Sequence, residues 1–471
     1  MRNRRETVGR TLGSPRKEQK RKRLFLTLLG TLVLGAAIWL GMICFEGQKP
    51  EIHITLENLR LGREQEIAFE ITEAGRGIKE YRVTFEQGFR DFVLAEKEFP
   101  GEEFLWATGV AHTPVQFSFK PSDLGVKDGE GTLRIWVRDA SFRRLFKGNV
   151  SVWEAKVFVD TEAPEIFVAT RNHYLSQGGA GLVAYRVSEP VRRSGVMVDG
   201  EFFPGHAGFG PKKDIYLAFF GIGHTPGSGK EIFLTAEDFA GNTGKSGFQH
   251  MVNSRRFKKD TITIKDRFLA WKMPEFKDPP EKSASLIEKF LFVNGPGRKA
   301  DENFIFAAAR ESLSEILWES VFMPLPSSAN RGGFADHRTY YYEGQEIDKQ
   351  YHMGIDLASV SQAPIPAAAR GRVVMTDNTG IYGKNVLIDH GCGLFSHYAH
   401  LTRVSVNVGD RLEKGDILGT TGLTGMVGGD HLHFGVVIGS RFVNPMEWLD
   451  AKWVENNILS KIRSVEAGEF D

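Results

Sequence analysis

The feature that most constrains this chain is an uninterrupted run without charge at residues 24–45, LFLTLLGTLVLGAAIWLGMICF. As an α-helix rising about 1.5 Å per residue it would be roughly 30 Å long, enough to cross the hydrocarbon core of a bilayer. The run is longer than the apolar part of a cleaved signal peptide, and no A-x-A-like site follows it. Ile43 stands before Cys44 where a lipoprotein signal needs a small residue. We therefore expect an uncleaved transmembrane helix without a lipid.

A strongly basic segment, residues 1–23, precedes this run. It carries a net charge of +8, which leaves −7 for the rest of a chain whose total is +1. Such a block can bind nucleic acid, but its place beside a membrane span favours a role in topology, with the N-terminus in the cytoplasm. We therefore expect no nucleic-acid partner. The basic residues are Arg2, Arg4, Arg5, Arg10, Arg16, Lys17, Lys20, Arg21, Lys22 and Arg23, and the acidic ones are Glu6 and Glu18.

The length and the cysteines limit how the rest of the chain can be organised. A chain of 471 residues is too long for one hydrophobic core, so three or four folded units are expected. The two cysteines are Cys44, in the expected membrane helix, and Cys392, far downstream. No disulfide between them is expected, and this scarcity of cysteine is compatible with an oxidising compartment without proving one.

Two β modules are predicted after the helix, at residues 50–160 and 163–255. Short runs alternate apolar and polar residues, as at Leu133, Ile135 and Val137, and are separated by Gly and Asp turns, which is typical of all-β sandwiches. The junction at residues 160–164, DTEAP, resembles that between tandem bacterial immunoglobulin-like modules. We expect the modules to act as spacers, with binding to the wall or to envelope proteins as the alternative.

A helical connector is predicted at residues 282–323. Apolar residues recur at helical spacing until Pro324, and Asn294-Gly-Pro-Gly297 predicts a split into two helices. We expect a connector packed on the following domain, while a cover over that domain's groove is the alternative. The apolar positions are Ile305, Ala309, Leu313, Ile316 and Leu317.

The C-terminal segment, residues 330–455, combines short β runs with clustered histidines. On a strand, residues an even number apart point to one face, so His352 can converge with Asp356, and His431 with His433. Catalytic zinc needs three protein ligands and an open position for water, which two imidazoles and one carboxylate satisfy. Either pair alone occurs by chance, but both in one β domain indicate a metal site.

These residues resemble a known family, the lysostaphin/LytM-type zinc metallopeptidases. The resemblance covers roughly residues 334–450 and rests on His352-x-x-x-Asp356, on Tyr-Ala-His400-Leu and on His431-x-His433, in that order. It implies a compact antiparallel β domain. It further implies that zinc is bound by His352, Asp356 and His433. His400 and His431 would then serve as the general base and the transition-state partner.

One passage departs from the family pattern. Gly428-Gly429-Asp430 stands where many members have a Ser-Thr-Gly-x stretch. The metal site is not affected, but the shape of the substrate groove is left open.

The resemblance implies hydrolysis of the peptide part of bacterial cell-wall peptidoglycan, at cross-links or stem peptides. The expected location is then the bacterial inner membrane, with the catalytic domain periplasmic and with envelope or division proteins as further partners. Proteolysis of a surface protein is a rival activity. A rival of another class is a catalytically silent scaffold, or an activator of other wall hydrolases, with a zinc site closed by a fourth protein ligand.

The remaining histidines are expected to lie outside the site. If residues 394–401 form a strand, the odd separation of His397 and His400 sends them to opposite faces unless a bulge intervenes. We predict that His400 faces the site and His397 the other side. His390, at a strand end, and His337, in a polar loop, are predicted to be surface or turn residues.

Overall fold

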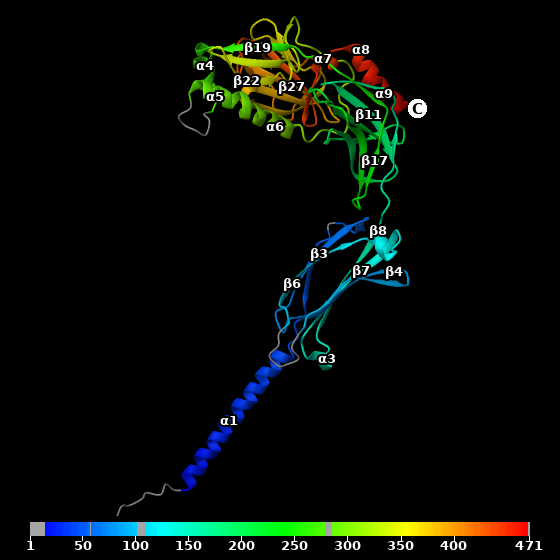
Figure 1. The fold of residues 1–471 in the computed structure, drawn as a ribbon, viewed down its shortest axis with the longest axis vertical. Helices are drawn as coiled ribbons and strands as arrows, with labels where there is room; N and C mark the ends of the chain where they lie inside the picture. The colour runs from blue at the N-terminus through cyan, green and yellow to red at the C-terminus, as the bar shows by residue number, and fades with distance from the viewer. Residues whose placement is uncertain (1–14, 57, 101–108, 278–284, 470–471) are drawn as a thin grey trace, which may run out of the picture. The chain divides into compact units, whose positions relative to one another are not determined.

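The computed structural model describes residues 15–56, 58–100, 109–277 and 285–469. Residues 1–14 of the basic segment and positions 282–284 of the expected connector lie outside this range. The described chain is mainly β, as predicted (Figure 1). It divides into two compact units, Met1–Glu162 and Ala163–Asp471, which are described separately.

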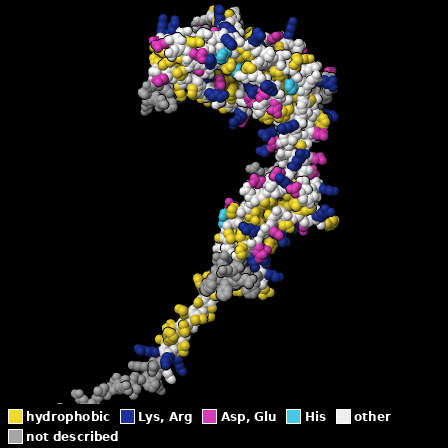
Figure 2. Space-filling view, in the orientation of Figure 1, with side chains coloured by type: hydrophobic (Ala, Val, Ile, Leu, Met, Phe, Trp, Pro, Cys, Tyr) yellow, Lys and Arg dark blue, Asp and Glu magenta, His cyan; other side chains and the backbone are white. Residues whose placement is uncertain are grey.

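The first unit begins with one long helix, α1 (Pro15–Cys44). Its segment Gln19–Cys44 is long and apolar enough to cross a membrane. The most apolar stretch of this segment contains no buried residue. Leu24, Leu32 and Trp39 are each more than half exposed. Figure 2 shows hydrophobic side chains along this helix and basic ones near its start. A continuous apolar surface of this kind marks a contact with lipid or with another protein.

A β-sandwich fills the rest of the first unit. Its sheets have the strand orders β1-β3-β6 and β2-β8-β7-β4-β5. Alternation along β3 buries Ile67 and Ile71, and alternation along β7 buries Leu133 and Ile135, so the two inner faces form one core. The elements are β1 (Glu51–Ile54), β2 (Arg60–Leu61), β3 (Gln65–Thr72), β4 (Ile78–Gln87), β5 (Arg90–Glu98), β6 (His112–Phe119), α2 (Pro121–Leu124), β7 (Gly129–Asp139), α3 (Arg143–Phe146) and β8 (Val150–Val159).

The second unit begins with another pair of four-stranded sheets, β14-β15-β11-β9 and β13-β12-β16-β17. Their core is continuous with that of the following domain: the Phe219 and Trp448 rings lie 6.0 Å apart, and the Ala180 N–H donates to the Glu447 carboxylate at 2.8 Å. This sandwich is therefore a rigid support for the C-terminal domain. Its strands are β9 (Ile166–Val168), β10 (His173–Ser176), β11 (Ala180–Val187), β12 (Val191–Val198), β13 (Glu201–Pro204), β14 (His206–Phe209), β15 (Ile215–Gly221), β16 (Ile232–Asp238), β17 (Thr243–Ser246) and β18 (His250–Asn253).

The connector differs from its prediction in two ways. Helix α5 (Leu286–Phe292) does not break at residues 294–297 but continues through a π-helical turn, Val293–Gly297, into α6 (Arg298–Ala308). Such a wider turn accommodates Pro296, which cannot donate within a regular helix. The helix also ends at Ala308, before Leu313 and Leu317.

The residues after α6 run as a non-helical segment along the C-terminal domain. The Leu313 N–H donates to the Asp389 carboxylate at 3.0 Å, and the Leu317 N–H to the His390 carbonyl at 2.9 Å. These bonds to a neighbouring domain replace those that a helix would make internally, so the helical spacing of apolar residues here reflects burial alone.

The C-terminal domain is built on an eight-stranded sheet with the order β20-β23-β31-β27-β26-β25-β29, in which β32 also pairs with β31. Smaller sheets, β24-β30-β28 and β19-β21-β22, complete it. The elements are β19 (Lys259–Ile264), α4 (Asp266–Lys272), β20 (Ala329–Gly332), β21 (His337–Tyr342), β22 (Gln345–Tyr351), β23 (Ile355–Ala358), β24 (Pro364–Pro366), β25 (Gly371–Thr379), β26 (Gly383–Asp389), β27 (Leu394–Leu401), β28 (Arg403–Val404), β29 (Arg411–Leu412), β30 (Ile417–Thr420), β31 (Leu432–Ile438), β32 (Arg441–Val443), α7 (Pro445–Trp448), α8 (Ala451–Val454) and α9 (Ser460–Ala467).

Candidate metal and catalytic site

Two central strands bring Asp356 and His433 together. Asp356 on β23 lies directly opposite His433 on β31, and side chains of opposite residues in an antiparallel pair share one face of the sheet. The neighbours Leu432 and Phe434 point to the other face, where they are buried. Gly354 allows the His433 ring to pack on the backbone, since a Cβ there would lie 2.5 Å from Nε2.

His352 reaches the same point from a turn. His352 lies between β22 and β23, outside any strand. It does meet Asp356, but strand parity, on which the prediction was based, is not the reason. Instead, its backbone N–H donates to the Asp336 carbonyl at 3.1 Å, and its Nδ1 lies 2.8 Å from the Gly333 carbonyl. Because a carbonyl only accepts, Nδ1 carries the proton and Nε2 presents a lone pair to the site.

Three potential ligand atoms meet at this point. His352 Nε2 lies 2.9 Å from Asp356 Oδ1 and 3.0 Å from His433 Nδ1, and His433 Nδ1 lies 3.1 Å from Asp356 Oδ1. The lone pair of His352 Nε2 thus faces a carboxylate oxygen with no proton fixed between them. A cation relieves this, and two imidazoles with one carboxylate are a donor set suited to zinc. The residues present therefore fit a metal ion.

The protonation of the cluster favours such binding. Burial raises the pKa of Asp356, but the adjacent histidines, His352 foremost, more than reverse this and hold its pKa well below the ordinary value. Burial lowers the pKa of His433 to about 4, despite its contact with Asp356. At neutral pH the carboxylate is therefore ionised and the His433 imidazole neutral, which are the forms that ligate metals.

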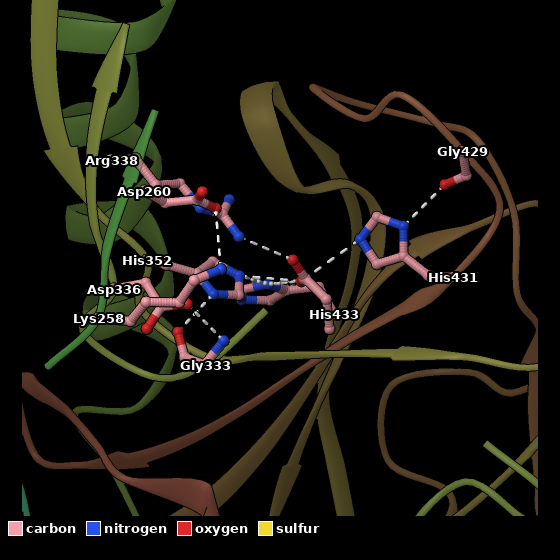
Figure 3. A network of polar contacts seen from close by, with 10 residues as sticks. Lys258, Asp260, Gly333, Asp336, Arg338, His352, Gly429, His431 and His433 are labelled. Carbon is pink, nitrogen blue, oxygen red and sulfur yellow. Dashed lines mark hydrogen bonds and ion pairs between the residues drawn. The ribbon is translucent and has the colours of Figure 1, made fainter. Parts of the chain in front are cut away.

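Arg338 was not predicted to belong to the site. Its Nη2 donates to Asp356 Oδ2 at 2.9 Å, so the second carboxylate oxygen is held while Oδ1 faces the histidines. Figure 3 shows Arg338 on one side of the His352–His433 pair and His431 on the other. Arg338 and His337 lie on strand β21, not in the predicted loop. Only the pairing of β21 beside β19 and β22 brings this arginine to the carboxylate, so its position in the sequence gave no signal.

Two further histidines lie beside these three potential ligands. His431 Nε2 lies 3.4 Å from Asp356 Oδ1, and its Nδ1 donates to the Gly429 carbonyl at 2.7 Å. His400 Nδ1 donates to the Thr424 carbonyl at 3.0 Å, which leaves its Nε2 as a lone pair. The His400 ring lies 5.0 Å from that of His431 and 5.6 Å from that of His433. All five predicted positions therefore converge.

These two imidazoles have opposite pKa shifts. Burial, with His431 and His433 nearby, lowers the pKa of His400 well below its ordinary value. Burial also lowers the pKa of His431, but its contact with Asp356 outweighs this and raises the pKa overall. His400 is therefore the neutral partner and His431 the more readily protonated one.

The prediction for His397 is wrong in its geometry. In the β27–β31 ladder, His397 lies opposite Gly435 and Ala399 opposite His433, so His397 shares the face of His433. His400 reaches the site because a bulge in the β26–β27 pairing places it at φ 67°, a conformation that non-glycine residues seldom adopt. His397 lies behind the site: it is fully buried, and its Nε2 contacts Asn385 Oδ1 at 3.1 Å.

His390 also differs from its prediction as a surface or turn residue. It is fully buried, with Nδ1 2.8 Å from the Arg370 carbonyl and Nε2 2.7 Å from Ser396 Oγ. Both ring nitrogens are thus used inside the core.

The site opens into a groove of about 850 Å³. His352, Asp356, His400, His431 and His433 all line it, whereas His397 does not. The groove continues along residues 260–271 of β19 and α4, and along residues 426–428 before His431. A peptide in this groove would pass beside all five polar side chains.

Comparison with known proteins agrees with this geometry. Residues 350–445 match the family described as Peptidase family M23. The peptidoglycan DD-endopeptidase ShyA of Vibrio cholerae is 36% identical over 96 residues, which are 20% of this chain and 22% of that protein. The DD-carboxypeptidase/endopeptidase Mpg of Neisseria gonorrhoeae is 37% identical over 95 residues, again 20% and 22% of the two chains. The chain thus spans about a fifth of the length of these relatives.

Among solved structures, the catalytic domain of lysostaphin from Staphylococcus simulans is 26% identical and covers 26% of this chain and 94% of its own, with a TM-score of 0.23. The matched family segment contains every residue of the five-membered cluster. Because residues 350–445 match this family, the chain carries a peptidase family M23 domain at its C-terminus.

Proposed function

We propose that this chain is a membrane-anchored zinc endopeptidase that hydrolyses peptide bonds of peptidoglycan. The observation that carries the proposal is the meeting of His352 Nε2, Asp356 Oδ1 and His433 Nδ1 within about 3 Å, in the lining of the groove. The relatives that match this domain support it, since ShyA is named as a peptidoglycan DD-endopeptidase and Mpg as a DD-carboxypeptidase/endopeptidase.

These three atoms would hold the zinc ion. When bound, zinc supplies Lewis-acid activation of water and of the scissile carbonyl. His400 accepts the proton of the attacking water at Nε2, because its Nδ1 is fixed as a donor to Thr424. His431 already donates from Nδ1 to the Gly429 carbonyl, and in its protonated form, which Asp356 favours, it donates from Nε2 to the oxygen on which negative charge develops.

The rival reading, a silent scaffold with a structural zinc, requires a fourth protein ligand. Among the described residues, the metal-suited group at this place has three members, His352, Asp356 and His433. Three ligands leave a position for water, and this favours a catalytic over a structural site.

The test is digestion of purified peptidoglycan by the detergent-solubilised protein, with released fragments identified by mass spectrometry. We expect peptide-bond cleavage that a chelator stops and added zinc restores. If the zinc-loaded protein released nothing, the scaffold or activator reading would replace the proposal. Cleavage that continued at the same rate in the presence of the chelator would rule out a metal-dependent mechanism.

The topology follows from the basic residues beside α1. We expect the N-terminus in the cytoplasm and both folded units outside it, because positively charged flanks stay inside. A reporter that matures only outside the cytoplasm, fused after Asp471, should be active. Activity solely of a cytoplasmic reporter at that position would contradict this topology.

Arg338 is predicted to support the metal site. Replacing Arg338 by methionine removes the bond to Asp356 Oδ2 and frees the carboxylate to rotate. Loss of such supporting contacts costs about 10- to 100-fold in metal affinity. Competition with a zinc chelator would measure this affinity, and Arg338→Lys should recover part of it. Unchanged affinity in Arg338→Met would show that the ion pair has no part in metal binding.

A further inference from the structure

One wall of the groove comes from outside the matched family segment. Strand β19 pairs in parallel with β21, and α4 follows it after one residue. Together they line the groove, as do residues 426–428 of the segment that leads to His431. The residues of this β19–α4 wall that line the groove are Asp260, Ile262, Thr263, Ile264, Lys265, Arg267, Phe268 and Trp271.

The β19–α4 wall is fixed in place. Ile264 and Leu269 are buried in a small core with Phe290 of α5 and Tyr340 of β21. Lys272, at the end of α4, is fully buried and donates to the Leu423 carbonyl in the segment that precedes His431. The wall is thus a preformed part of the groove, with side chains at set distances from the catalytic residues.

Two exposed side chains of this wall that line the groove are basic, whereas the exposed Asp266 between them accepts a hydrogen bond from the Tyr342 hydroxyl at 2.8 Å and does not line the groove. Lys265 and Arg267 are both exposed, and no ion pair within the described part of the chain neutralises them. The carboxylates described along the groove are already paired: Asp356 with Arg338 at 2.9 Å, and Asp260 with Lys258 at 3.7 Å. The β19–α4 wall therefore offers two cations, Lys265 and Arg267, to whatever the groove binds.

An aromatic surface adjoins these cations. Trp271 is 46% exposed, and its ring packs edge-on against Phe268 at 6.2 Å. An exposed indole held in this way contacts aliphatic groups of a ligand at little cost in side-chain entropy. Cations beside an aromatic platform suit a ligand with carboxylates on short aliphatic stems.

We propose that the β19–α4 wall recognises the carboxylates of an acidic peptide substrate, with Lys265 and Arg267 pairing with them and Trp271 packing on the adjoining aliphatic carbons. This inference rests on the proposed function and adds the substrate class: peptides with free carboxylates are preferred over the same peptides amidated. The residues responsible lie before the family segment, so the preference belongs to this chain's own groove.

A binding assay can measure the preference for free carboxylates in the absence of hydrolysis. The probes are a fluorescently labelled disaccharide-peptide of peptidoglycan with free carboxylates and the same fragment with its carboxylates amidated. Anisotropy is recorded with the full-length protein carrying His400→Ala, so that the probe is not consumed. We expect the free acid to bind more tightly. Adding Lys265→Gln and Arg267→Gln should weaken its binding about three- to tenfold, as expected for two exposed ion pairs, and leave the amidated probe within about twofold.

A matched control changes charge without touching the groove. Arg256→Gln with Lys259→Gln removes two exposed cations, one just before β19 and one within it, neither of which lines the groove. This variant should bind both probes as the parent does. Equal binding of the two probes by the parent, or an equal loss in the control, would overturn the inference.

The carboxylate preference and the proposed peptidase activity can fail independently of each other. If the zinc-loaded wild type cleaves free and amidated substrates with equal kcat/KM, the peptidase proposal stands and the carboxylate preference falls. If it cleaves neither substrate while the binding preference holds, the groove is a recognition site without hydrolysis.

Discussion

Replacing His433 by alanine is expected to abolish zinc binding. Its Nδ1 is one of three atoms that meet within about 3 Å, and the remaining pair, His352 and Asp356, cannot complete the site. Because changes to residues that merely support ligands cost about 10- to 100-fold in affinity, losing a ligand should cost more than about 100-fold. Elemental analysis should find about one zinc per wild-type chain and almost none in the variant.

Thermal unfolding provides the control for folding. Zinc that binds only the folded state stabilises it, by about 2.7 kcal/mol at a hundred times its Kd. The wild type should therefore melt at a higher temperature with zinc than with chelator, whereas His433→Ala should melt alike in both. A variant that kept full zinc occupancy would show that His433 is not a ligand.

Replacing His400 by alanine should leave zinc in place and remove hydrolysis. His400 reaches the groove through the bulge in β27, but it does not belong to the three-atom cluster. Loss of a general base costs about 10²- to 10⁴-fold in rate. Turnover of peptidoglycan fragments, measured beside zinc content on the same preparation, should fall by that factor. Digestion that survived this substitution would remove His400 from the mechanism.

His397 offers the matched comparison. It lies on the same strand and on the site's side of the sheet, but its Nε2 is used by Asn385 and it does not line the groove. His397→Ala should therefore keep most of the zinc and most of the turnover per folded molecule. Its cost should appear as lower thermal stability, because the side chain is fully buried. Loss of zinc from this variant would mean that the wrong histidine had been chosen.

The local patterns were sufficient for much of this protein. Alternation of apolar and polar residues predicted the β class, because one buried face of a strand imposes a period of two. The charge-free run predicted a helix able to cross a membrane, since only length and polarity decide that. The residue types and spacing of His352, Asp356 and His433 predicted that they would come together, although His352 does so through a turn.

Tertiary structure decided the rest. Parity placed His397 on the wrong face and His400 on the right one for the wrong reason, because the bulge that turns His400 to the site depends on the pairing of β27 with its neighbour and not on β27 alone. The spacing of apolar residues after Ala308 predicted a helix that does not form. The backbone groups of this segment make their hydrogen bonds with the neighbouring domain and so need no helix. Arg338 and the β19–α4 wall join the site through pairing between distant strands. The sequence by itself thus determined which residue types gather at the candidate metal site, and the fold determined which side chains surround them.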